Sequence, residues 1–256
     1  MFKVEMFKMI RKRETKIIFC LLALPILFSV LFANVPAFVV DYPFGDKIPQ
    51  LPFAVTVFGF FSTLGVFGLV FSILATSTLS SEISSHHTLL FFPRLASKKK
   101  LFSSKLYVLL VVVLIWFALF IVSSMVGYIL TQNSDKAVYA KTFTDESTIY
   151  WVLNAVCFLF ELFFIVGVVL LLGLYLNNMV SILVSLAIVY GSVLFSEVPV
   201  LCYALPSYYK KMAMDCVDLN NTSSLIGYTL GCVAVSLVYL LISQVVGRKK
   251  ISMVES

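Results

Sequence analysis

Charged residues are scarce in this sequence. They make up 12% of its 256 residues, whereas hydrophobic residues make up 61% and the mean hydropathy is +1.02. A soluble domain carries roughly 25% charged residues, so a water-soluble globular protein is excluded. Segments of about ten residues with alternating polarity, which a transmembrane barrel needs, are also missing. The net charge of +6 comes without a basic patch interleaved with aromatic residues, which excludes a nucleic-acid partner.

Catalytic and nucleotide-binding motifs are missing as well. The sequence has no G-x-x-x-x-G-K-[ST] phosphate loop, no G-x-S-x-G and no H-E-x-x-H. Its two histidines, His86 and His87, are adjacent, so on a helix they point about 100° apart, and no Cys or Asp nearby completes a metal site. We therefore expect no enzymatic activity, no cofactor and no metal ion on this chain.

What the sequence has instead is a series of apolar runs, each long enough to cross about 30 Å of hydrocarbon. They predict an all-α integral membrane protein with one domain, residues 1–256, and six transmembrane helices. The predicted spans are residues 17–33, 53–79, 106–130, 149–176, 179–198 and 223–246. The fourth and fifth spans meet at Asn177 and Asn178 and must be antiparallel. A cleaved signal peptide is the competing interpretation of the first span, but no convincing A-x-A site follows Val30.

The N-terminal arm, residues 1–16, is both basic and amphipathic. It places Phe2, Met6, Met9 and Ile10 on one helical face, which predicts a short helix lying in the plane of the lipid headgroups. A disordered basic arm that only fixes orientation is the alternative.

The distribution of lysine and arginine predicts the orientation. The N-terminal arm has six, the polar insert at residues 80–105 has five and the C-terminal tail has three, against five on the opposite side. Basic residues accumulate on the cytoplasmic side of membrane proteins. We therefore expect a multi-pass protein of the cell membrane with both termini in the cytoplasm.

The polar insert at residues 80–105 is the longest hydrophilic segment between two apolar runs. Residues 82–90 can form a short helix, which Pro93 then stops, and a basic cluster follows at Arg94 and residues 98–100. A short helix between two spans can pass a push from a soluble partner to both of them. A plain basic loop that only sets topology is the alternative.

This insert resembles the loop between the second and third spans of type-2 ABC transporter permeases (the ABC-2 family), written E-x-x-x-G-T-L, then P, S-R and G-K. The matching residues here are Glu82, Thr88, Leu89, Pro93, the basic cluster and Lys105. His87 stands where the family has Gly before Thr, and Ser104 where it has Gly before the final Lys. The six spans, the N-terminal helix and the tight turn after the fourth span also resemble this family.

The resemblance implies that the insert carries a coupling helix that docks on a separate ABC ATPase subunit, present in two copies, which holds the ATP and Mg²⁺. The residues expected to make that contact are Glu82, Ile83, His87, Thr88, Leu89 and Pro93. It also implies a second permease chain, identical or homologous, and a re-entrant hairpin at residues 199–221 on the outer side. A short permease of this kind resembles those of bacteriocin or lantibiotic immunity and peptide export, which implies an amphipathic antimicrobial or cytolytic peptide as the substrate.

Glu161 is a carboxyl group near the middle of the fourth predicted span. On a lipid face its ionised form would cost at least a few kcal/mol, so it should face protein or a water-filled path. It would then line a translocation path for a cationic substrate, form a contact across a dimer, or be a protonated structural group. Glu197, at the outer end of the fifth span, is expected to be a wet boundary residue.

Cysteines fall in two groups. Cys20, Cys157 and Cys232 lie inside predicted spans and are expected to be packing residues, whereas Cys202 and Cys216 share the last outer segment and are candidates for a disulfide. Outside the transporter class, a membrane scaffold or sensor whose basic loop docks a signalling partner also fits the sequence. An ABC ATPase partner distinguishes the two functions.

Overall fold

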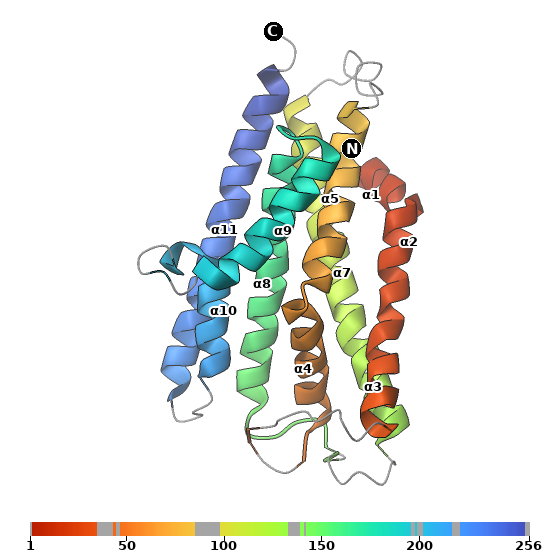
Figure 1. The fold of residues 1–256 in the computed structure, drawn as a ribbon, viewed down its shortest axis with the longest axis vertical. Coiled ribbons are helices and arrows are strands. Elements are labelled where there is room, and N and C mark those ends of the chain that lie inside the picture. Colours follow the sequence, from red (N-terminus) through yellow and green to blue (C-terminus); the bar gives the residue numbers. More distant parts are fainter. Residues whose placement is uncertain are drawn as a thin grey trace.

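The computed structural model describes residues 2–34, 43–44, 47–84, 98–132, 139–140, 142–195, 198, 202–216 and 221–253. Within these ranges the regular structure is helical, apart from one isolated bridge between Ile48 and Tyr139. The expectation of an all-α fold is confirmed. Figure 1 shows a bundle in which the first helix and the last turns of the final helix lie at the same end.

The helices follow one another along the bundle (Figure 1). The first half of the chain forms α1 (Phe2–Arg11), α2 (Arg13–Cys20), the 3₁₀ turn η1 (Leu21–Ala23), α3 (Leu24–Asn34), α4 (Gln50–Thr63) and α5 (Val66–Ser84). The second half forms α7 (Lys98–Thr131), α8 (Thr148–Leu172), α9 (Asn178–Phe195), η3 (Cys202–Ala204), α10 (Pro206–Asp215) and α11 (Thr222–Met253).

Four stretches of helix in the described ranges are long and apolar enough to cross a membrane. They are Arg13–Ala33, Leu101–Thr131, Thr148–Leu172 and Thr222–Ile251. These correspond to the first, third, fourth and sixth predicted spans, and they are compatible with a multi-pass membrane protein.

The second predicted span, residues 53–79, is two helices and not one. Gln50–Thr63 and Val66–Thr78 are bent by 68° relative to each other and count as one further span only if taken together. Gly65 lies between them with φ of 72°, a left-handed conformation that side chains other than hydrogen disfavour. The break is therefore placed at the one residue in this segment that adopts it without strain.

The fifth predicted span, residues 179–198, is shorter than expected. Its described apolar helix covers Met179–Ile188, below the length of a full span. The preceding helix α8 ends at Leu172, four residues before the predicted end, and residues 173–177 form the turn into α9. The tight connection is present, and α9 packs against both α8 and α5.

An aromatic core joins the first half of the bundle to α7. Trp116 of α7 is fully buried, and its ring lies 4.9 Å from Phe67, 5.1 Å from Phe71 and 5.2 Å from Phe120, centroid to centroid. The indole Nε1 donates a hydrogen bond of 2.8 Å to the carbonyl of Ile18. Because lipid offers no hydrophobic drive between helices, such close packing and hydrogen bonds hold membrane helices together.

Candidate functional sites

The most deeply placed charges in the described part of the bundle form an ion pair between α8 and α10. Nζ of Lys210 lies 2.8 Å from Oε1 and 2.7 Å from Oε2 of Glu161. The side chains are 15% and 11% exposed, respectively. The Lys210 ammonium also lies 5.5 Å from the centre of the Phe158 ring, within the range of a cation–π contact. Glu161 thus faces protein, and its charge is matched by a bidentate partner.

The short helix α10 brings Lys210 to this position. The chain enters α10 in an extended conformation at Leu205, and Pro206 occupies the first helical position, where its missing N–H costs nothing. Tyr150 Oη of α8 donates a 2.6 Å hydrogen bond to the carbonyl of Met214 near the other end of α10. The helix is therefore fixed against α8 on both sides of Lys210.

The opposite flank of α10 packs on α11 at a glycine. A Cβ atom built on Gly231 would lie 2.5 Å from Cδ1 of the Tyr209 ring, closer than real Cβ contacts allow. Only hydrogen fits at this position while the two helices keep their spacing. Gly231 therefore sets how closely α10 approaches the bundle, and with it the reach of Lys210.

Polar groups continue along the same face of α8. Tyr150, Asn154, Cys157 and Glu161 recur at intervals of four, three and four residues, the spacing of one helical face, and all four are buried. Asn154 Nδ2 donates a 3.0 Å hydrogen bond to the carbonyl of Tyr150, whereas Asn154 Oδ1 is buried without a partner. We call these four residues the polar face of α8.

The polar face of α8 meets α11 at two cysteines. Cys157 and Cys232 are both fully buried, and Cys232 Sγ lies 3.7 Å from the carbonyl oxygen of Cys157. Both are free thiols, as are Cys202 and Cys216, so the Cys202–Cys216 disulfide stays a prediction. No cluster of three or more metal-ligating side chains occurs in the described part of the chain.

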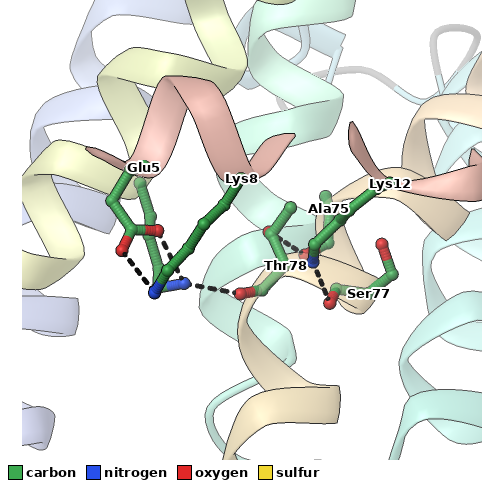
Figure 2. Close-up of polar contacts among 7 residues, drawn as sticks. Glu5, Lys8, Lys12, Ala75, Ser77 and Thr78 are labelled. Carbon is green, nitrogen blue, oxygen red and sulfur yellow. Dashed lines mark hydrogen bonds and ion pairs between the residues drawn. The ribbon is translucent and has the colours of Figure 1, made fainter. Parts of the chain in front are cut away.

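A second buried charge cluster joins α1 to α5 and α7 (Figure 2). Nζ of Lys105 lies 3.1 Å from Oε2 of Glu5 and donates a 2.8 Å hydrogen bond to the carbonyl of Thr78. Nζ of Lys8 lies 3.4 Å from Oε1 of Glu5, and Lys12 donates a 2.6 Å hydrogen bond to the carbonyl of Ser77. We call this cluster the α1 clamp.

The α1 clamp differs from the predicted arrangement of the N-terminal arm. The side of α1 that carries Glu5 and Met9 is buried, and α1 packs against α7, whereas Phe2, Phe7 and Ile10 are exposed. Burial raises the pKa of Glu5, but the nearby Lys105 and Lys8 ammonium groups lower it further, so its pKa lies below the ordinary value of 4.5. The ionised carboxylate is therefore the stable form in the folded chain.

The residues predicted to dock the ATPase fall around the end of α5. Glu82 and Ile83 belong to the last turn of α5, so the first part of the predicted coupling helix continues a longer helix. The rest of this set, together with His86, Glu197 and the basic cluster's Arg94, lies outside the described residues; its members are His87, Thr88, Leu89 and Pro93. The α1 clamp binds the carbonyls of Ser77 and Thr78, one turn before Glu82.

Sequence reasoning found Glu161 but missed both of its neighbours on other helices, Lys210 and Gly231. Lys210 and Lys211 read as part of an outer loop, and the available signal was Pro206 followed by ten residues free of further helix breakers. Comparison of the chain with known family models, curated proteins and solved structures finds no match.

Proposed function

We propose that this chain is the membrane-spanning subunit of an ATP-driven exporter of the ABC-2 type, which moves an amphipathic antimicrobial or cytolytic peptide out of the cell or its membrane. The observation that carries the proposal is the α1 clamp. It ties an N-terminal helix to the two helices, α5 and α7, that flank the basic insert.

A push on the insert would reach the bundle through both of these helices. Residues 85–97 connect α5 directly to α7, and Lys12 and Lys105 bind adjacent carbonyls at the end of α5. Helix α5 in turn packs against α8 and α9, and α8 carries Glu161. A displacement of α5 is thereby passed to the helices that surround the buried ion pair.

The partners follow from this mechanism. ATP and Mg²⁺ are held by a separate ABC ATPase subunit in two copies, and a second permease chain, identical or homologous, completes the path. Both termini lie in the cytoplasm, with Glu161 on the translocation path or at the contact between the two permease chains. The excess of Lys and Arg at the termini and in the insert, together with the shared end of α1 and α11 in Figure 1, supports this orientation.

Co-purification tests the proposal. The tagged chain is extracted in mild detergent from its native host beside a variant with Glu82→Ala, Thr88→Ala and Leu89→Ala. We expect a protein with a Walker A motif and an ABC signature to accompany the unchanged chain and to be lost from the triple variant. A control with Arg13→Ala and Lys16→Ala, two exposed positions on α2, should retain the ATPase.

Two results would count against the exporter. Absence of any ABC ATPase from the unchanged chain removes the energy source, and a signalling protein bound through the insert would favour the membrane scaffold instead. Equal loss of the ATPase from the triple variant and the α2 control would place the contact outside the insert.

A further inference from the structure

The inference concerns the surroundings of Glu161 and rests on the proposed export function for its biological meaning. Helices α8 and α11 run in the same direction beside each other (Figure 1). Cys157 contacts Cys232, and a Cβ on Gly167 would lie 3.7 Å from Ser243 Oγ. This register places Ser236 at the level of Glu161.

Ser236 has a hydroxyl group that is fully buried and has no hydrogen-bond partner. Asn154 Oδ1, also buried and without a partner, lies two helical turns from Glu161, about 10 Å along the axis of α8. A buried oxygen without a donor is costly, so such atoms are usually satisfied. Two of them beside a carboxylate form a set of acceptors that exceeds what Lys210 satisfies in this arrangement.

The group that fits this set of acceptors is a primary ammonium. It carries three donors on one compact charge, enough for both oxygens of Glu161 and one neutral oxygen such as Ser236 Oγ. Lys210 supplies such a group from a ten-residue helix. Because a lysine stem is long and flexible, its ammonium can leave the carboxylate as α10 shifts.

We propose that Glu161, Ser236 and Asn154 form a binding site for a primary ammonium group of the transported substrate, and that Lys210 occupies this site while no substrate is bound. A lysine side chain or the N-terminus of an amphipathic peptide provides such a group. Substrate entry then exchanges one ammonium for another at Glu161, so the buried carboxylate is never left unpaired. Movement of α10 away from α8 accompanies the exchange.

Chemical rescue tests this site in the purified full chain without the ATPase. Lys210→Ala removes the internal ammonium and leaves space for n-butylammonium, which copies the lost side chain. We expect saturating n-butylammonium to raise the melting temperature of Lys210→Ala by about 2–4 °C, with no comparable rise for the unchanged chain. Neutral n-butanol, which copies the stem without the charge, should not produce this rise.

The double variant Glu161→Gln, Lys210→Ala is the matched control, since it has the same space but no carboxylate. Its melting temperature should not respond to n-butylammonium, and Ser236→Ala in the Lys210→Ala background should weaken the response. Lys210→Gln provides a milder vacancy where Lys210→Ala does not fold. Lack of rescue in the vacancy variant that folds, or equal rescue by n-butanol or in the double variant, would overturn the site. Failure here leaves the co-purification result unaffected, so the two proposals fail separately.

Discussion

Lys210 and Glu161, 49 residues apart in the chain, meet as a bidentate ion pair at 2.7 and 2.8 Å between α10 and α8. An ion pair inside an apolar bundle contributes little net stability compared with a well-packed apolar pair, but removal of one partner strands the other charge. Retention of both charges is thus better explained by a role in function or specificity than by stability alone.

Single substitutions in this pair should destabilise the chain more than the double substitution does. Glu161→Gln or Lys210→Met leaves one buried charge without a partner, at a cost of about 3 kcal/mol, whereas the combined variant leaves none. Unfolding of all four proteins in the same detergent measures the coupling. Additive losses would mean that the two charges do not interact in the folded chain.

Gly231→Ala should loosen α10 from the bundle. The added methyl group would meet the Tyr209 ring at 2.5 Å, so the ring or the helix must move, at a cost of about 1–3 kcal/mol. Gly227→Ala on the same helix is the control, because a Cβ there meets nothing within 4 Å. Melting temperatures should fall for the first and stay level or rise slightly for the second. Equal values would contradict the close approach.

Much of the bundle could be predicted because crossing a membrane requires about 20 apolar residues regardless of what packs around them. This rule was enough for the helices at Arg13–Ala33, Leu101–Thr131, Thr148–Leu172 and Thr222–Ile251. The break at Gly65 was missed, since glycine is common in membrane helices and its left-handed conformation depends on the packing of α4 and α5.

The candidate site was only half predictable for a similar reason. A carboxyl group at Glu161 in an apolar run signals a buried partner, but not which residue provides it. Two adjacent lysines, Lys210 and Lys211, lie in a segment that hydropathy assigns to an outer loop. Which of them points at α8 is decided by the docking of α10 through Tyr209 and Met214, contacts between helices that no local pattern encodes.

Gly65→Ala tests the break between α4 and α5. A methyl group at φ of 72° costs about 1 kcal/mol in the left-handed conformation, so the variant should be less stable than the unchanged chain. Thermal unfolding in detergent measures the difference, again with Gly227→Ala as the control. A gain in stability would show that α4 and α5 prefer one continuous helix.

The α1 clamp should weaken in acid. Because the pKa of Glu5 in the folded chain lies below 4.5, its ionised form stabilises the fold above that pH, and this contribution is lost as the pH falls below 4.5 through the folded value. Glu5→Gln should remove this part of the pH dependence and lower stability at pH 7. Melting temperatures from pH 7 to pH 3 compare the two chains. Parallel curves would show that Glu5 does not titrate with folding.

ATP-dependent peptide accumulation in inside-out membrane vesicles tests the central claim most directly. Vesicles from the native host would be loaded with a fluorescent, lysine-containing amphipathic peptide, with the unchanged chain, the chain deleted, or the Glu82→Ala, Thr88→Ala, Leu89→Ala variant. We expect accumulation that requires ATP and the unchanged chain and is lost in the other two. Accumulation that is the same in all three, or absent from all three while the ATPase is bound, would contradict a peptide exporter.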